Sequence, residues 1–324
     1  MVKANAVQAV TMALRGALKG DKNVVVIGED VGVNGGVFRA TDGLQKEFGK
    51  DRVIDTPLSE LGIAGAAVGM AVNGMKPVAE IQFSGFLYAS FDQLVSHAGR
   101  IRSRSRGRFS CPMVIRAPGG GGIRALELHC ECNEALFAHT PGLKVVYPST
   151  PYDVKGLLAA AIQDPDPVVF LEPMRIYRAI KEEVPEEDYV IPLGKANVVR
   201  EGTDMTLITW GALVKSALQA VESIKDKVNV EVIDLRTIYP FDVETVIASV
   251  KKTGRALVLH EAPRTGGFGA EIVAQINEKA LDSIEAPVLR ITGYDMVLPF
   301  ANLENEYIPS EERIIAGIHK VMDY

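Results

Sequence analysis

The chain opens with an alternation of short apolar runs and longer stretches that have helical periodicity. The apolar runs are rich in β-branched residues and predict strands at residues 24–27, 78–83, 113–116, 144–147 and 168–171. Around them the sequence predicts helices near residues 5–18, 60–74, 84–101, 133–139 and 151–163. Strands this short and apolar, separated by helices, are typical of a parallel sheet that is buried on both faces.

One helix start can be read directly from the residues. Thr150 is a suitable N-cap, Pro151 takes the first helical position, and Asp153 falls in the first turn. This arrangement predicts that the helix near residues 151–163 begins immediately after Thr150.

An acidic segment divides the chain. Residues 181–188 read KEEVPEED, which is the composition expected of a surface linker. The alternation then resumes, with predicted strands at 205–210, 230–235, 256–260 and 288–291 and helices near 212–225, 242–251, 268–280 and 311–322. The sequence therefore predicts an α/β protein with two open, largely parallel sheets flanked by helices, in domains 1–180 and 198–324 joined by a linker at 181–197.

Composition narrows the class of protein. The 324 residues are 47% hydrophobic and 23% charged, which is ordinary for a globular chain with a sizeable core. The net charge of −6 favours neither nucleic acid nor an anionic membrane, and no apolar run reaches the roughly 18 residues of a membrane span. The first residues have neither signal-peptide nor transit-peptide character. Three cysteines are too few for a disulfide framework, so we expect a cytoplasmic enzyme or interaction protein.

The segment 55–69 is the first candidate for chemistry. A turn is expected at Pro57, and Ser59 can cap a helix that starts with Glu60. The helix dipole favours the negative charge of Glu60 in the first turn. Three glycines follow inside this helix, and each lowers the stability of the helix by about 1 kcal/mol relative to alanine. We therefore expect another helix or a ligand to approach the backbone closely at these positions. Periodicity alone favours a structural role, with Glu60 as the first-turn carboxylate of a tightly packed core helix.

A glycine-rich segment, 118–132, is the second candidate. Four consecutive glycines at 119–122 follow a predicted strand, and bare backbone at the carboxyl end of a strand is where α/β proteins bind ligands. The pattern matches neither a dinucleotide fingerprint nor a phosphate loop. His129 is either a proton donor or a hydrogen-bonded loop histidine, and Cys130 and Cys132 lack a second pair at zinc-binding spacing.

Aromatic residues end the strand predicted at 78–83. Phe86 is either a platform for a planar ring or an ordinary core residue. The glycines of segment 260–269, at the end of a strand in the second half, are expected to serve a turn.

Together these segments resemble the beta subunits of the decarboxylating component of 2-oxo acid dehydrogenases, of the pyruvate and branched-chain kinds. The resemblance runs essentially from end to end. It rests on the stretches GEDVG at 28–32, GGVFR at 35–39, DTPLSE at 55–60, EIQF at 80–83, PGLKVV at 141–146, PSTPYD at 148–153, FLEP at 170–173, DLRT at 234–237 and HEAP at 260–263. It implies a transketolase-like pyrimidine-binding domain followed by a transketolase carboxyl-terminal domain.

The resemblance also implies a cofactor, thiamine diphosphate, and the residues that hold it. Glu60 matches the glutamate that binds the ring nitrogen of the aminopyrimidine and shares a proton with it. Glu29 matches a second acid on the cofactor side, and Gln82 is expected there too. Phe86 takes the place of the aromatic residue, a tyrosine in many members, that stacks on the pyrimidine ring.

His129 matches the family's active-site histidine, which is proposed to orient or protonate intermediates and the incoming lipoyl group. Many relatives have two adjacent histidines followed by Ser-x-Ser. Here the sequence reads Leu128-His129 followed by Cys130-Glu131-Cys132, so the departure from the family concerns the substrate pocket.

Some relatives bind a monovalent cation on this subunit. The matching positions, a candidate potassium site, are Met113, Ala161, Ile162, Asp164 and Asp166. The alternative is a helix end followed by a polar turn at 164–167.

The sequence contains no Gly-Asp-Gly, the motif with which thiamine enzymes hold magnesium and the diphosphate. The resemblance implies that an alpha subunit supplies this half of the site, in a heterotetramer of two alpha and two beta chains. The helix near 60–74 would lie against another subunit. The lipoyl domain and the subunit-binding domain of a dihydrolipoyl acyltransferase are further expected partners.

The expected activity is oxidative decarboxylation of a 2-oxo acid with reductive acylation of a lipoyl group, together with the alpha subunit. Three alternatives stand beside it. A beta subunit for acetoin cleavage would share the same motifs. A non-catalytic scaffold of this fold is disfavoured because Glu60 and His129 are both in place, and a nicotinamide-dependent oxidoreductase is disfavoured by the failed glycine fingerprint.

Overall fold

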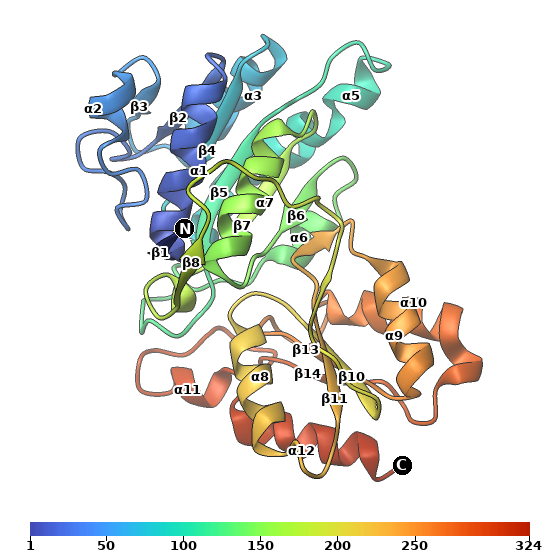
Figure 1. Cartoon of the computed structure of the whole chain (residues 1–324). Coiled ribbons are helices and arrows are strands. Elements are labelled where there is room, and N and C mark those ends of the chain that lie inside the picture. The colour runs from blue at the N-terminus through green and yellow to red at the C-terminus, as the bar shows by residue number, and fades with distance from the viewer.

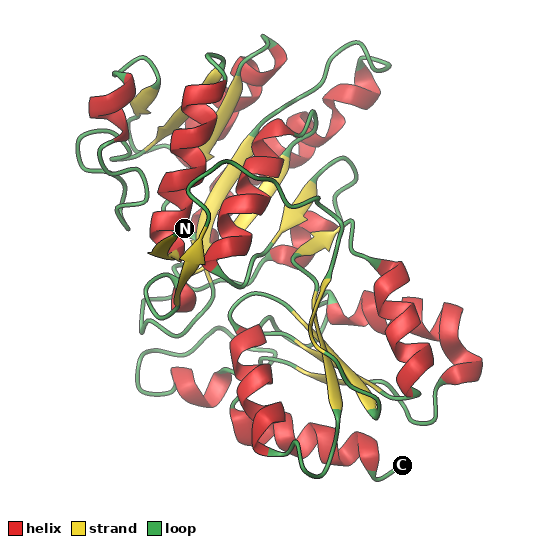
Figure 2. Cartoon of the chain, viewed as in Figure 1, coloured by secondary structure: helices red, strands yellow, loops and turns green.

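A computed structural model describes all of residues 1–324. The chain folds into two α/β units, which lie one above the other in Figure 1, the first drawn from blue to green and the second from yellow to red. Helices cover both faces of the central sheet in each unit (Figure 2). The predicted α/β architecture with two open, largely parallel sheets is confirmed.

The first sheet has seven strands in the order β12-β6-β7-β5-β4-β2-β3, and all neighbours are parallel except β12 and β6. Its strands are β2 (Val24–Gly28), β3 (Val53–Asp55), β4 (Lys76–Glu80), β5 (Val114–Gly119), β6 (Lys144–Val146), β7 (Val168–Pro173) and β12 (Thr237–Tyr239). Every residue of β2, β5 and β7 is buried, as expected of central parallel strands.

Residues of these strands alternate between two hydrophobic clusters. Val25 and Ile27 contribute to one cluster, and Val24 and Val26 contribute to the other. The first cluster lies under α3 (Glu60–Val72), α4 (Leu87–Asp92) and α6 (Glu134–Ala138), and the second under α1 (Ala6–Gly20) and α7 (Pro151–Gln163). The start of α7 is confirmed, because Thr150 accepts a hydrogen bond of 3.1 Å from the Asp153 amide and Pro151 is the first helical residue.

The second sheet has the order β14-β13-β10-β11-β9, with only β9 antiparallel. Its elements are β9 (Asn197–Arg200), β10 (Met205–Thr209), α8 (Leu213–Ser223), β11 (Val230–Asp234), α9 (Val243–Thr253), β13 (Ala256–Leu259), α10 (Gly269–Ala280), β14 (Leu289–Ile291), α11 (Glu304–Tyr307) and α12 (Glu311–Met322). Helices α8 and α12 pack on one face, and α9 and α10 pack on the other.

The two units are tightly joined. One hydrophobic cluster is continuous between them, since it includes Ile115 and Val145 of the first sheet and Ile208 and Ile233 of the second. Strand β12, which follows β11 in the chain, leaves the second sheet and pairs with β6 of the first. The relative position of the two units is therefore fixed by core packing and by backbone hydrogen bonds.

The predicted linker is not wholly irregular. Its first residues form β8 (Lys181–Val184), which pairs antiparallel with β1 (Val2–Asn5) near the amino terminus. The division of the chain at 181–197 stays a prediction.

The structure departs from the predicted elements in one long stretch. The helix expected near 84–101 is divided into the 3₁₀ turn η1 (Ser84–Phe86), α4, the π-helical turn η2 (Gln93–His97), the 3₁₀ turn η3 (Ala98–Arg100) and the start of α5 (Ile101–Arg104). The strand expected at 78–83 ends at Glu80. None of the helices combines the length and the apolar composition that crossing a membrane would require.

Candidate functional site

Four neighbouring parallel strands lead to the residues that the sequence singles out. Glu60 follows β3, Glu29 follows β2, Gln82 and Phe86 follow β4, and His129 lies in the loop after β5. Because parallel strands end at the same edge of a sheet, these residues are brought to one edge, where α/β proteins bind ligands. We call this edge the candidate site.

Two carboxylates form one side of the candidate site. Glu60 is the first residue of α3, whose N-cap Ser59 accepts a hydrogen bond of 3.2 Å from the Gly62 amide. Glu29 is 8% exposed, and its Oε1 is buried without a hydrogen-bond partner. Burial and the nearby charge of Glu60 raise the pKa of Glu29. A buried acceptor without a donor, beside a second acid, fits a ligand that carries N–H groups.

Aromatic rings form another side of the candidate site. The ring of His129 lies 4.2 Å from that of Phe83 and 5.1 Å from that of Phe86, measured between centroids. Phe38 contacts Phe83 edge-on at 5.6 Å. Phe86 and Gln82 are both half-buried. Acids and aromatic faces together fit a flat heterocycle with polar edges, which is the chemistry of an aminopyrimidine.

The loop that carries His129 is held closely against the first unit. Ser84 donates a hydrogen bond of 2.7 Å to the Glu131 carbonyl, and Asn133 donates one of 2.8 Å to the Ser84 carbonyl. A Cβ atom on Gly85 would collide with the Leu128 carbonyl, so only glycine allows this approach. Within the loop, Nδ1 of His129 lies 2.9 Å from the Glu127 carbonyl. The orientation of the imidazole is therefore fixed by its neighbours.

The glycines at 119–122 have a different role from the one expected. Their backbone is not open to a ligand, because other parts of the chain already cover it. A Cβ at Gly119 would lie 2.6 Å from Ser84 Oγ, and one at Gly121 would lie 2.9 Å from a methyl group of Leu298 in the second unit. The glycines permit close packing of the two units, and the cysteines beyond them are free thiols.

A buried charged triad next to the candidate site was not predicted. Arg116, in the middle of β5, contacts Glu80 at 2.7 Å and Glu172 at 2.6 and 2.9 Å. Burial raises the pKa of Glu80, and the Arg116 charge opposes this shift. The sequence offered one signal of this triad, a charged residue within or directly after each of three predicted apolar runs. In the structure, Glu80 and Arg116 are direct partners in the β4–β5 register. Since Glu80 ends β4, the triad supports the loop that carries Gln82 and Phe86.

The five candidate cation residues lie at the opposite edge of the sheet, before β5 and β7. The Met113 carbonyl accepts a hydrogen bond of 3.0 Å from Val168, and the Ala161 carbonyl accepts one of 3.3 Å from Asp164. Ile162 is buried at the end of α7. The structure thus brings these residues together, away from the candidate site.

The two acids of this set already have positively charged partners. Asp164 accepts hydrogen bonds of 2.5 and 2.7 Å from Lys144, and Asp166 pairs with Arg102 at 2.6 Å. A monovalent cation at this edge would therefore be bound through main-chain carbonyl oxygens, with the carboxylates neutralised by the chain itself.

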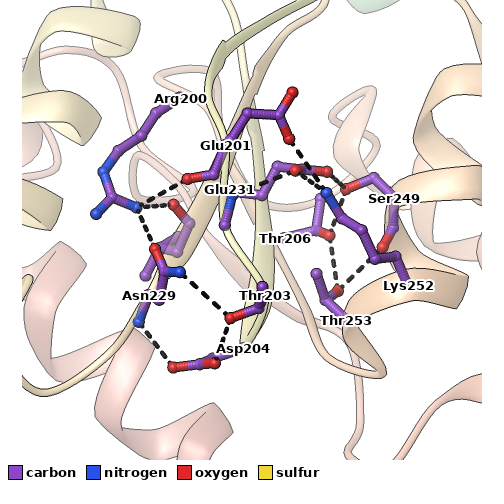
Figure 3. Close-up of polar contacts among 12 residues, drawn as sticks. Arg200, Glu201, Thr203, Asp204, Thr206, Asn229, Glu231, Ser249, Lys252 and Thr253 are labelled. Atoms are coloured by element: carbon purple, nitrogen blue, oxygen red, sulfur yellow. Dashed lines mark hydrogen bonds and ion pairs between the residues drawn. The ribbon is translucent and has the colours of Figure 1, made fainter.

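A second polar cluster lies at the amino ends of β10 and β11 (Figure 3). Its centre is the buried carboxylate of Glu231, which accepts hydrogen bonds from Ser249, Lys252 and the Gly202 amide. Thr206 bridges Ser249 and Thr253 at 2.6 and 2.8 Å. The donors and acceptors of the cluster satisfy one another, which indicates a structural role.

The glycine-rich helix α3 has an outer face without contacts from this chain. Gly62, Ala66 and Gly69 are exposed along it, and a Cβ on Gly69 would meet no atom within 4 Å. Leu58, which is 80% exposed, and Leu61 flank the start of the helix. Gly65 faces Gln93, whose Oε1 would lie 3.4 Å from a Cβ at this position, but at Gly69 the close approach that the glycines predict is not made within this chain.

Comparison with known proteins is consistent with this geometry. Residues 3–179 match the family described as transketolase, pyrimidine binding domain, and residues 194–314 match the transketolase C-terminal domain. A solved structure described as "Split gene transketolase, inactive beta4 tetramer" has a TM-score of 0.79 to this chain at 19% identity and covers 99% of both chains. The fold is that of the transketolase-like, thiamine-diphosphate-dependent enzymes.

Closer relatives define the family. The chain is 54% identical over 325 residues to the pyruvate dehydrogenase E1 component subunit beta of Bacillus subtilis (strain 168), with 100% of each chain covered. It is 55% identical over 315 residues to the protein of the same name from Acholeplasma laidlawii, covering 97% of this chain and 96% of the relative. The chain belongs to the family of E1 beta subunits of thiamine-diphosphate-dependent 2-oxo acid dehydrogenases. The resemblance seen in the sequence is confirmed.

Proposed function

We propose that this chain, together with an alpha subunit, catalyses the oxidative decarboxylation of pyruvate and the reductive acylation of a lipoyl group in the cytoplasm. The observation that carries the proposal is the meeting of Glu29, Glu60, Phe86 and His129 at one sheet edge, in a chain 54% identical to a pyruvate dehydrogenase beta subunit. Thiamine diphosphate, when bound, supplies the electron sink that lets a 2-oxo acid lose carbon dioxide.

The two acids have complementary roles in this proposal. Glu60 binds the ring nitrogen of the aminopyrimidine and exchanges a proton with it. Glu29 lies beside Glu60, and burial together with the nearby charge of Glu60 raises the pKa of Glu29. The unpartnered Oε1 of Glu29 supports a polar contact to the same ring system. Phe86 supports the ring by stacking, and Gln82 contributes a polar group on the cofactor side.

His129 is the proposed proton donor and acceptor for the substrate and the lipoyl group. A carbonyl oxygen can only accept, so the 2.9 Å contact to Glu127 indicates that Nδ1 carries the proton of the neutral ring. Nε2 is then free to take up a proton and to give it back. The aromatic rings of Phe83 and Phe86 pack against the imidazole that carries this nitrogen.

An alpha subunit completes the proposed enzyme as an alpha2-beta2 heterotetramer and holds most of the magnesium ligands. The contact-free face of α3 and the exposed Leu58 support a subunit interface beside Glu60. We propose the lipoyl and subunit-binding domains of a dihydrolipoyl acyltransferase as further partners. Potassium, if held by this chain, would bind the carbonyl oxygens around Met113 and Ala161.

The test is co-expression with an alpha subunit, followed by measurement of carbon dioxide release from pyruvate and from branched 2-oxo acids, and of acetoin cleavage. We expect pyruvate to be the best substrate. Glu60→Gln should abolish release, whereas Glu278→Gln, a change at an exposed residue of α10, should leave it unchanged. Near-normal turnover by Glu60→Gln would support a scaffold instead, and preferential acetoin cleavage would reassign the substrate.

A further inference from the structure

Two carboxylates of the second unit reach across to the glycine loop of the first. Glu261 lies just after β13, and Glu304 is the first residue of α11. The Gly121 amide donates a hydrogen bond to Glu261. Glu304 accepts hydrogen bonds of 2.7 Å from the Gly122 amide and 3.1 Å from the Arg124 amide. Three backbone donors within four residues are therefore held by side chains more than a hundred residues away.

These hydrogen bonds offset the free-energy cost of burying the two carboxylates. Glu304 is 2% exposed and forms no ion pair, and the nearest cation to Glu261 is Arg175, at 3.8 Å. A buried carboxylate needs hydrogen-bond donors, and backbone N–H groups that converge on it provide strong, charge-assisted ones. The position of each carboxylate and the conformation of the loop therefore depend on each other.

The loop has a conformation that it would not adopt unaided. Arg124 and Leu128 have left-handed backbone torsions, with φ of 59° and 62°, which non-glycine residues rarely adopt. Such torsions persist only where the surroundings impose them. Glu304 binds the amide of Arg124 itself, and Leu128 packs on Gly85 of the first unit.

His129 lies between two anchors that belong to different units. Toward the amino end of the loop, Glu261 and Glu304 of the second unit hold residues 121–124. Toward the carboxyl end, Ser84 of the first unit holds the Glu131 carbonyl. Release of either anchor would free the segment that positions the imidazole against Phe83 and Phe86.

We infer that Glu304, assisted by Glu261, is a positioning residue that sets the orientation of His129 from the second unit. The inference rests on the proposed role of His129 in catalysis. It gives the second unit a part in the chemistry, although neither carboxylate is among the residues assigned to the cofactor.

The first arm of the test measures amide hydrogen exchange at residues 121–124 in the assembled complex. Glu304→Gln removes the charge and places an amide group against the backbone donors. We expect exchange at Gly122 and Arg124 to accelerate by about tenfold or more. The matched control is Glu306→Gln, an exposed glutamate on the same helix, which should leave exchange unchanged. Glu261→Gln provides an independent variant, read at Gly121.

The second arm measures decarboxylation kinetics. Glu304→Gln should lower kcat by about tenfold, with little change in KM for pyruvate, because the site remains but its histidine is misplaced. In a His129→Ala background the same substitution should have no further effect on kcat. A merely structural defect would lower kcat equally in both backgrounds.

The inference is overturned if amide exchange at 121–124 is unchanged in both variants, or if Glu304→Gln lowers kcat to the same extent with and without His129. The two proposals fail in distinguishable ways. An assembled wild-type complex with no decarboxylase activity would contradict the proposed function, and the exchange measurement would still decide whether Glu304 holds the loop.

Discussion

Trp210 and Glu134 meet at the junction of the two units, where the indole nitrogen donates a hydrogen bond of 3.3 Å to the carboxylate. Glu134 begins α6 of the first unit, and Trp210 follows β10 of the second. Glu134 is 1% exposed, and its second oxygen has no partner. Burial raises the pKa of Glu134 to about 7, and the charge of Glu261 adds to this shift.

The raised pKa of Glu134 predicts a pH-dependent stability. The unfolded carboxyl group loses its proton near pH 4.5, whereas the folded one keeps it up to about pH 7. The folded state therefore binds more protons in this window, and the free energy of unfolding falls as pH rises through it. The full shift corresponds to a loss of about 3 kcal/mol, taken as an upper limit. Urea unfolding between pH 4.5 and 8 should show the contribution of Glu134 as the difference in slope between the wild type and Glu134→Gln, because Asp234, whose pKa is also raised to about 7, adds a slope of the same sign and His260, whose pKa is lowered to about 4, opposes it. An identical slope in the variant would contradict the assignment, and Glu278→Gln serves as the control.

The Glu231 cluster of Figure 3 predicts the opposite dependence. Burial would raise the pKa of Glu231, but hydrogen bonds from Lys252 and Ser249 outweigh it, so the pKa lies below its ordinary value of 4.5. The stabilisation is then present above pH 4.5 and is lost as the pH falls through the lowered value. Because Lys252 is partly exposed, Glu231→Gln should cost only about 1–2 kcal/mol at pH 7.

Chemical unfolding at pH 7 and at pH 3 would measure this difference. The gap between Glu231→Gln and the wild type should narrow at the lower pH. Lys225→Met, which breaks an exposed pair with Glu222, is the control and should have no measurable effect. A gap that is the same at both pH values would show that packing, and not charge, stabilises the cluster.

Gly85→Ala should displace the loop that carries His129. The new methyl group would collide with the Leu128 carbonyl, which is backbone and cannot rotate away. We expect a loss of about 1–3 kcal/mol in stability and at least a tenfold loss of decarboxylase activity in the assembled complex. Gly20→Ala, at the end of α1 with nothing within 4 Å, should leave activity unchanged and should not lower stability. Full activity in Gly85→Ala would mean that the position of the loop does not matter.

Gly69 offers a test of the proposed subunit interface. Within this chain a Cβ at Gly69 meets nothing within 4 Å, so Gly69→Ala should stabilise α3 by about 0.5–1 kcal/mol in the isolated chain. Gly69→Leu should impair assembly with the alpha subunit, because the leucine side chain would occupy the outer face of α3, where we expect the alpha subunit to approach the helix backbone. Unfolding of the chain alone and sedimentation of the mixture measure the two effects. Normal assembly of Gly69→Leu would contradict an interface at this face.

Much of the fold and of the candidate site was determined by local sequence. The apolar runs at β2, β5 and β7 predict buried parallel strands because only such strands are apolar on both faces. Thr150 fixes the start of α7 by capping it with its side chain, and Pro151 does so by its restricted backbone. The quoted motifs identify the family, and the resemblance is what named Glu60 and Glu29 as candidate cofactor residues. Glu29 directly follows β2, and Glu60 is the first residue of α3.

Tertiary structure decided what depends on contacts between distant residues. The helical periodicity near 84–101 predicts one continuous helix, and nothing in it indicates that the stretch is divided into several short helical turns. The pairing of β12 with the first sheet, and the contacts of Glu304 with Gly122 and of Glu134 with Trp210, join residues far apart in the chain. Local patterns record burial and backbone preference, whereas the partner of a buried charge is fixed only when the whole chain has packed. For this reason the sequence predicted which residues would hold the cofactor, and the structure revealed what holds those residues in place.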